Sequence, residues 1–223
     1  MRYSIKRVER LPELDSGRES EEWSGANVIT IERFLTPGHD HKPRTEARML
    51  HDGENIAVFF YVDDRYVVAK GIEYQARTHR DSCVEFFLEP VAGKGYFNFE
   101  FNCCGTLLLS YIEDSRRKGE GFESYSMVPE EVISGMEVRA SLAGPILEEI
   151  EEPVVWTVSY RVPKSVFEAY LDPFGSLYGM KMRGNVYKCA DDCSHPHWGY
   201  WADIGEVLNF HQPEKFADIV FEG

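Results

Sequence analysis

Polar side chains alternate with large apolar ones along two neighbouring stretches of the sequence, and this pattern predicts a ligand-binding face on a β-sheet. Residues 81–90 (DSCVEFFLEP) and 96–102 (YFNFEFN) both have the two-residue period of a half-buried strand. In the second stretch the three Phe share the face that packs in the core, so Asn98, Glu100 and Asn102 share the opposite face. Amides and carboxylates on rigid strands bind hydroxyl groups well. We therefore expect a sugar-binding sheet face.

Two acidic residues of these stretches, Glu85 and Glu100, are expected on adjacent strands. Glycoside hydrolases use two carboxyl groups roughly 5–10 Å apart, on either side of the scissile bond. Carboxylates also accept hydrogen bonds from sugar hydroxyls. Because no feature of the sequence indicates a raised pKa, we favour binding over cleavage, and hydrolysis by this pair is the alternative.

A second concentration of reactive side chains lies at residues 189–197 (CADDCSHPH), where two thiols, two carboxylates and two imidazoles occur within nine residues. Structural zinc sites usually combine two separated pairs of ligands, such as Cys-x-x-Cys with a distant second pair. The spacing here does not match that arrangement. We expect a loop in which Cys189 and Cys193 are buried and the histidines line a surface pocket.

Aromatic residues gather close to this cluster and could stack on the apolar faces of pyranose rings. They are Trp198, Tyr200, Trp201 and Phe210. Ligand sites combine such flat platforms with a few placed polar groups. Trp198 and Trp201 are three residues apart, so in an extended segment they point to different faces. We expect at least one of them to be buried.

Short strand-like segments separated by Gly, Pro and Asp dominate the chain and predict an antiparallel sandwich or barrel. Residues 45–62 form a predicted hairpin with Asp-Gly at its turn. Further strands are expected near residues 82–90, 96–103, 105–112, 135–143, 153–162, 177–187 and 216–222. One short helix is expected at 163–170, because Pro163 suits a helix start. Residues 113–131 and 189–213 are predicted to be surface insertions, the first of them a solvated loop.

The composition limits the partners. The chain has 24 basic and 38 acidic residues, a net charge of −14, which argues against binding to nucleic acid or to an anionic membrane. No apolar run is long enough to span a bilayer, and the first residues lack the apolar segment of a signal peptide. The five cysteines form no spaced framework, so we expect reduced, buried thiols. The expected location is cytoplasmic, or extracellular if a leader has been removed.

Four stretches of the sequence resemble signatures of the family 9 carbohydrate-binding modules. Residues 81–88 (DSCVEFFL) resemble the Asp-Ser-Val-Glu-hydrophobic-Phe signature, with Cys83 as a departure. Residues 55–64 (NIAVFFYVDD) resemble the strand before it, and 156–163 (WTVSYRVP) the strand that leads into a short helix. Residues 210–219 (FHQPEKFADI) resemble the closing segment. The four stretches occur in the order of the family.

The resemblance implies a β-sandwich related to the DOMON and immunoglobulin-like folds that binds mono- and oligosaccharides, often at the reducing ends of xylan or cellulose chains. Family members hold the sugar between two Trp rings, read its hydroxyls with a Glu, an Arg and amides, and carry structural calcium. The matching positions in this chain are Glu85 for the glutamate, Asn98, Glu100 and Asn102 for the polar strand, Arg183 and Asn185 after the helix, and Phe210 for one ring.

The chain also departs from the family pattern. Thr78, His79 and Arg80 stand where the family has a stacking Trp before Asp81, and Glu100 stands where the family has an Arg. One half of the aromatic sandwich is therefore missing unless Trp198, Trp201 or a tyrosine supplies it. Six aspartates offer oxygen ligands for calcium without an EF-hand pattern. They are Asp52, Asp63, Asp64, Asp81, Asp191 and Asp192.

Taken together, these features predict one all-β domain, residues 1–223, an antiparallel β-sandwich with one short helix and long loops. We expect it to bind an oligosaccharide or polysaccharide without cleaving it. The expected ligand-binding residues are Glu85, Asn98, Glu100, Asn102, Arg183, Asn185, Trp198, Trp201 and Phe210. Calcium is the expected structural cofactor. The alternatives are a hydrolase or metal-dependent enzyme using Glu85 with Glu100 or the Asp191–His197 cluster, and a protein-interaction domain with a degenerate site.

Overall fold

The two alternating stretches form adjacent antiparallel strands in a computed structural model that describes all 223 residues. They are β7 (Cys83–Glu89) and β8 (Tyr96–Asn102), and Glu85 lies directly opposite Glu100. Phe97, Phe99 and Phe101 are buried in the main core, as the two-residue period predicts. The polar residues of β8 therefore share the other face of the sheet.

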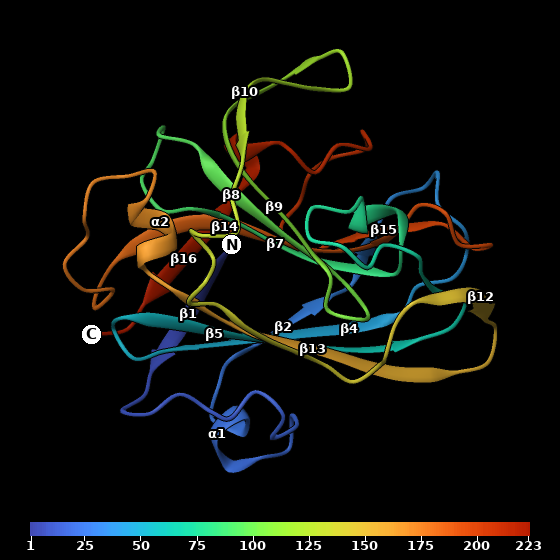
Figure 1. The fold of residues 1–223 in the computed structure, drawn as a ribbon, viewed down its shortest axis with the longest axis horizontal. Coiled ribbons are helices and arrows are strands. Elements are labelled where there is room, and N and C mark those ends of the chain that lie inside the picture. The colour runs from blue at the N-terminus through green and yellow to red at the C-terminus, as the bar shows by residue number, and fades with distance from the viewer.

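We call the layer that contains these strands the front sheet (Figure 1). Its strands are antiparallel, in the order β10-β9-β8-β7-β14, and both β15 and β16 pair with β14. The additional strands are β9 (Leu107–Lys118), β10 (Gly121–Met127), β14 (Lys181–Ala190), β15 (His197–Tyr200) and β16 (Ala217–Phe221). The short strand β3 (Arg33–Phe34) extends this layer beyond β15.

The second layer, the back sheet, is antiparallel in the order β2-β4-β5-β13-β11. Its strands are β2 (Val28–Ile31), β4 (Arg44–His51), β5 (Asn55–Asp64), β11 (Glu137–Ala140) and β13 (Val154–Pro163). The predicted hairpin at 45–62 corresponds to β4 and β5 and is confirmed. At its turn, the Asp52 carboxylate accepts hydrogen bonds from the backbone N–H groups of Glu54 and Asn55.

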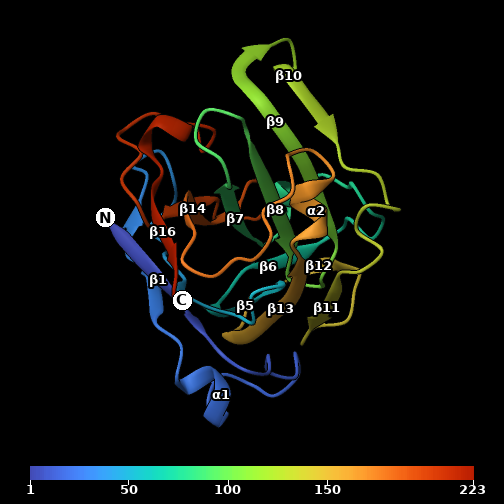
Figure 2. The same ribbon diagram turned by 90° about the vertical axis from the view of Figure 1, so that its left-hand side faces the viewer.

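Strand β1 (Arg2–Arg7) joins the two layers, because it pairs with β16 of the front sheet and with β4 of the back sheet. Both of these pairings are parallel, whereas all the others are antiparallel. The predicted β-sandwich is thus confirmed, and the sequence did not reveal its parallel junction. Figure 2 shows β1 and β16 side by side at one edge of the molecule.

The core fills the space between the layers and is rich in aromatic side chains. Tyr160 of the back sheet stacks on Phe101 of the front sheet, with ring centroids 4.3 Å apart. Trp156 and Phe60 are also fully buried in this cluster. A smaller cluster on the outer side of the front sheet includes Phe87, Tyr187 and Phe210.

The helices are short and lie at the periphery. Helix α1 (Glu21–Ser24) covers the outer face of the back sheet with Trp23, which packs on Phe59 (Figure 1). Helix α2 (Ser165–Glu168) occupies the centre of the helix predicted at 163–170 and buries Val166 and Phe167. The remaining elements are β6 (Val67–Ala69), β12 (Ile146–Ile150), and the 3-10 turns η1 (Thr78–Arg80) and η2 (Pro213–Lys215). No helix is both long enough and apolar enough to cross a membrane.

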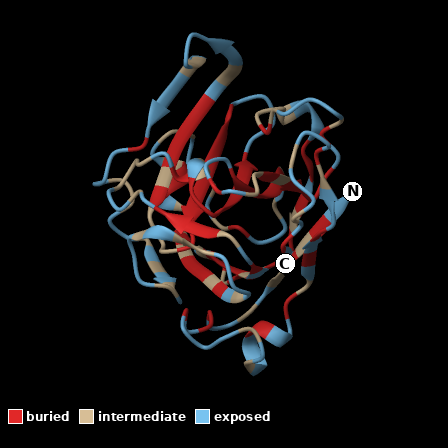
Figure 3. Ribbon diagram, turned by 90° about the vertical axis from the view of Figure 1, so that its right-hand side faces the viewer, coloured by how far each residue is buried: buried red, intermediate tan, exposed pale blue.

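The prediction of a solvated loop at 113–131 was wrong. Strand β9 continues to Lys118 and turns into β10, so this segment is a long hairpin, which we call the arm (Leu107–Met127). The arm projects from the body of the sandwich, and its outer part is exposed (Figure 3). The charged residues of this segment reflect solvent exposure of a hairpin and not the absence of strand structure.

Candidate functional site

A cavity of about 620 Å³ lies on the outer face of the front sheet. Side chains from six strands reach it, because the register aligns their outward-facing positions in rows across the sheet. Glu85 of β7 is paired with Glu100 of β8, and Glu100 in turn with Leu108 of β9. In the next row across the same strands, Asn98 is paired with Ser110. All five residues line the cavity.

Glu100 has the most distinctive environment in the floor of the cavity. Its side chain is almost fully buried, and its Oε1 accepts a hydrogen bond of 2.6 Å from the Asn98 amide. Its Oε2 is buried without any hydrogen-bond partner. The His79 Nδ1 lies 3.6 Å from this oxygen, an ion-pair distance that is too long for a hydrogen bond. Glu100 therefore lines the cavity and has one carboxyl oxygen without a hydrogen-bond partner.

The electrostatics of the floor favour the protonated form of Glu85. Burial, followed by the nearby Cys189 and Glu100, raises the pKa of Glu85 well above its usual value. Contact with Glu100 raises the pKa of His79. The Cys189 thiol donates to Glu85 Oε1 at 3.1 Å. The floor thus has one carboxyl group whose neutral form is favoured, and a second one, that of Glu100, which faces an imidazole.

Trp198 forms one wall of the cavity from strand β15. Its ring is half-buried, and its Nε1–H donates to the Asp191 carboxylate at 2.7 Å, which fixes the ring orientation. Phe210 lies nearby, but one face of its ring is covered because it stacks on Tyr187 with centroids 4.1 Å apart. Trp198 and Phe210, both predicted as stacking residues, therefore line the same cavity as Glu85 and Glu100.

The arm supplies the opposite wall. Phe122 and Tyr125 of β10 line the cavity, and the Arg117 guanidinium lies 4.5 Å from the centroid of the Phe122 ring. At the arm's tip Glu120 forms a 3.5 Å ion pair with Arg77, which precedes η1. These two rings were not among the predicted site residues. The apolar residues of this segment could have indicated a strand, and they are Phe122, Tyr125 and Met127. Bulges in β10 break the strict alternation that would have made the strand recognisable.

Four predicted site residues lie outside the cavity, and hydrogen bonding or packing accounts for each position. Asn102 braces a turn, since its amide donates to Gly71 O and its Oδ1 accepts from the backbone of Thr106. Asn185 is fully buried and bonds both backbone groups of Ala202.

The other two residues stabilise the region around the C-terminus. Arg183 forms a 3.3 Å ion pair with Glu89 and donates to the carbonyl of Phe216. Trp201 is buried in the main core with its ring edge against Tyr3, which confirms that one of the two tryptophans is buried. The structure therefore does not bring these four residues together with Glu85 and Glu100.

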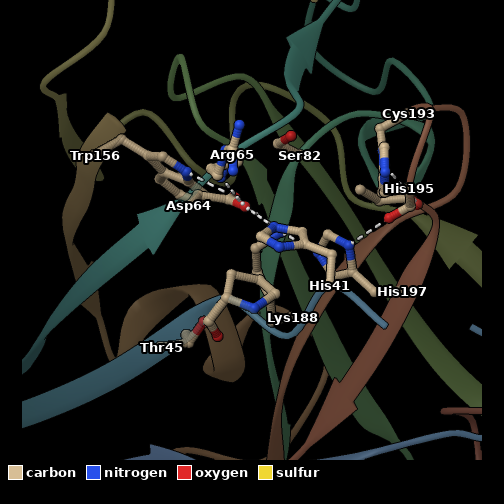
Figure 4. A network of polar contacts seen from close by, with 12 residues as sticks. His41, Thr45, Asp64, Arg65, Ser82, Trp156, Lys188, Cys193, His195 and His197 are labelled. Atoms are coloured by element: carbon tan, nitrogen blue, oxygen red, sulfur yellow. Dashed lines mark hydrogen bonds and ion pairs between the residues drawn. The ribbon is translucent and has the colours of Figure 1, made fainter. Parts of the chain in front are cut away.

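The Asp191–His197 cluster is divided between two faces of the front sheet. Cys189 lines the cavity, but the preceding residue of the strand, Lys188, points to the opposite face. There the buried Lys188 ammonium donates to His197 Nε2 at 2.8 Å and lies 3.4 Å from Asp64 Oδ2 (Figure 4). His197 Nδ1 is 2.9 Å from the carbonyl of His195. These residues therefore form a structural network, and the predicted cluster is not one site.

The aspartates considered for calcium do not form an oxygen cage. Asp64 is bound by His41, Trp156 and Lys188. Four others have separate protein partners: Asp81 accepts from backbone N–H groups at 70 and 71, Asp52 from those at 54 and 55, Asp191 from Trp198, and Asp192 pairs with Arg80. The sixth, Asp63, is exposed on β5 next to the buried Asp64. Calcium prefers 6–8 converging oxygen ligands. These residues do not fit a calcium site.

A cavity with aromatic walls and a polar floor on the face of a β-sandwich indicates a sugar-binding fold. The sequence model of carbohydrate-binding family 9 matches residues 21–221. The chain belongs to this family. No curated protein matches the chain.

Solved structures agree with the assignment of this family 9 protein. A candidate carbohydrate-binding protein from Bacteroides uniformis is 30% identical, with a TM-score of 0.84 over 99% of both chains. A family 9 module from Caldicellulosiruptor kristjanssonii has been solved in complex with cellotriose and in complex with glucose. The cellotriose complex has a TM-score of 0.67 and the match covers 94% of that chain, and the glucose complex has a TM-score of 0.65 with 96% of that chain covered. Both matches cover 100% of this chain. At 13% identity these two share the fold.

Proposed function

We propose that the cavity of the front sheet binds the end of a glucan- or xylan-type oligosaccharide and does not cleave it. The observation that carries this proposal is the buried Glu100 Oε2, which has no hydrogen-bond partner although Glu100 lines a cavity with aromatic walls. A buried acceptor without a hydrogen bond costs about 1–3 kcal/mol. A sugar hydroxyl that donates to this oxygen would remove that cost.

The two walls offer flat aromatic surfaces on which a pyranose ring can stack. Trp198 and Tyr125 come from strands on opposite sides of the sequence β9-β8-β7-β14, so they flank the floor from both sides. Tyr125 is 44% exposed and Trp198 is half-buried, so both rings have surface available for a ligand. In this arrangement the arm supplies the ring that the family places before Asp81.

The other floor residues have supporting roles in this proposal. Asn98 uses its amide to hold Glu100 and its Oδ1 to accept from the backbone N–H of Ser110 at 2.7 Å, so it positions the carboxylate. His79 donates to a second hydroxyl or stays paired with Glu100. The complexes of the Caldicellulosiruptor module with cellotriose and glucose support the choice of ligand class.

The test is a calorimetric titration of the protein with cello-, xylo- and manno-oligosaccharides, each with a native and a borohydride-reduced end. Saturable binding of the cello or xylo series supports the proposal, and loss of binding after reduction supports capture of the reducing end. No heat with any of these sugars contradicts the proposal.

One observation favours a second candidate, glycoside hydrolysis. Glu85 has a raised pKa and lies opposite Glu100, so the pair resembles a general acid next to a carboxylate. However, the Glu85 carboxyl group is buried and accepts a hydrogen bond from the Cys189 thiol, so it is not free to protonate a glycosidic oxygen. Chromatography of the titrated oligosaccharides after long incubation separates the two functions, since shorter products would establish hydrolysis.

A further inference from the structure

Two cysteines and a glutamate converge next to the cavity, and two of the three, Cys189 and Glu85, line it. The Sγ atoms of Cys83 and Cys189 and a carboxylate oxygen of Glu85 all lie within 4.8 Å of one another. All three side chains are almost completely buried. No role in sugar binding explains why two thiols lie beside this carboxyl group.

The strand register creates this arrangement. Cys83 of β7 lies directly opposite Cys189 of β14, and Glu85 is two residues further along β7 on the same face. The two cysteines belong to the small cluster on the outer side of the front sheet, away from the main core. Both strands are central in this sheet, so the backbone holds the three side chains in place.

The chemistry of the three groups suits a soft divalent cation. Zinc binds thiolates at about 2.3 Å and carboxylate oxygens at about 2.0–2.2 Å, so its ligand atoms lie roughly 3.3–3.8 Å apart in a tetrahedral site. The observed contact of 3.1 Å between Cys189 Sγ and Glu85 Oε1 is slightly shorter than this. Small side-chain rotations would increase the distance between Cys189 Sγ and Glu85 Oε1 to the spacing of zinc ligands.

Of the cationic side chains that line the cavity, His79 faces Glu100 and Arg77 pairs with Glu120. Lys188 is adjacent in sequence but points to the other face, where it is bound to His197 and Asp64. Glu85 and Cys189 line the cavity, which gives an ion a path from solvent.

We propose that Cys83, Cys189 and Glu85 bind one zinc ion at the bottom of the cavity, with its fourth position directed toward the cavity. Three protein ligands and one open position are a known zinc arrangement. The site shares Glu85 with the cavity floor, but it rests on the geometry of the three ligands and not on the proposed sugar binding.

The test uses cobalt, which reports thiolate ligands by its absorption. Metal-free, reduced protein is titrated with Co²⁺ and then with Zn²⁺. We expect one Co²⁺ per chain with an intense near-ultraviolet charge-transfer band, and displacement by Zn²⁺. Absence of this band in the wild-type protein would overturn the proposal, whatever the behaviour of the variants.

Variants identify the ligands. Cys83→Ser and Cys189→Ser should each lower the cobalt affinity at least tenfold, and Cys193→Ser should leave the affinity unchanged, because Cys193 is buried outside the cavity. A full charge-transfer band in the Cys83→Ser, Cys189→Ser double variant would also contradict the site. Sugar titrations are carried out on separate samples, so failure of sugar binding and failure of metal binding are distinguishable.

Discussion

Glu85 and Glu100 are directly opposite each other on adjacent strands, and their carboxyl groups have different partners. Glu85 accepts from the Cys189 thiol, whereas Glu100 accepts from the Asn98 amide and keeps a second buried oxygen without a partner. This difference separates their roles. Glu100 is the acceptor available for a sugar hydroxyl, and Glu85 faces the two cysteines.

We predict that Glu100→Gln weakens binding of the best oligosaccharide about 10- to 100-fold. A hydrogen bond to a charged group contributes about 1.5–3 kcal/mol, and the amide is a poorer acceptor. The measurement is isothermal titration calorimetry. Glu148→Gln, an exposed change on β12, is the control and should bind like wild type. Equal affinity in Glu100→Gln would remove Glu100 from the site.

The two neighbouring tryptophans should respond differently to replacement by Ala. Trp198→Ala should lower sugar affinity about tenfold or more, about 1.4 kcal/mol, with little change in stability. Trp201→Ala should destabilise the fold by about 3–5 kcal/mol, because this ring is buried in the core. Sugar titration and urea unfolding of both variants test this contrast. Unchanged sugar affinity in Trp198→Ala would show that this ring does not stack on the ligand.

The arm should contribute to binding and not to folding. Tyr125→Ala should lower sugar affinity severalfold and change the free energy of unfolding by less than about 0.5 kcal/mol, as is usual for exposed positions. Leu147→Ala removes an even more exposed apolar side chain, which does not line the cavity, and should affect neither property. If both variants bind like wild type, the arm is not a wall of the sugar site.

Stability should fall as the pH drops below about 6.5, partly because of His197. Burial and the Lys188 charge lower the pKa of His197 to about 3, whereas an unfolded His titrates near 6.5. Below about pH 6.5 the unfolded chain therefore binds a proton that the folded protein does not. The stability from this residue is complete above 6.5 and is lost as the pH falls toward 3.

The expected loss from His197 between pH 7 and pH 5 is about 2 kcal/mol. Urea unfolding at both pH values measures it. His197→Gln should reduce the loss, because Gln can still accept from Lys188 and does not titrate. His39→Gln, at an exposed position, should leave the loss unchanged. The same pH dependence in His197→Gln and wild type would exclude this explanation.

Asp64 should extend the loss of stability to lower pH. Burial alone would raise its pKa, but Lys188 and His41 lower it below the usual value. Its contribution is therefore present above about pH 4 and lost as the pH falls further.

The strand pattern allowed the floor of the cavity to be predicted from sequence. Period-2 alternation determines which side chains of β7 and β8 share a face, so Glu85, Asn98 and Glu100 could be assigned together. The same argument placed three Phe of β8 in the core. Local periodicity is sufficient where a strand is long and has one buried face.

The positions that depend on distant segments could not be predicted. Arg183 donates to the carbonyl of Phe216, near the C-terminus, and Trp201 packs against Tyr3, near the N-terminus. The local sequence around Arg183 and Trp201 does not indicate these contacts. The arm was missed because β10 pairs only with β9 and is largely exposed, so burial does not impose a pattern on its sequence.

The most direct test is a crystal structure of the protein with a bound cello- or xylo-oligosaccharide of the series that titrates best. We predict a terminal sugar ring between Trp198 and Tyr125, with one hydroxyl within hydrogen-bond distance of Glu100 Oε2. A sugar bound at another face, or a cavity that stays free of sugar at saturating concentration, would contradict the account.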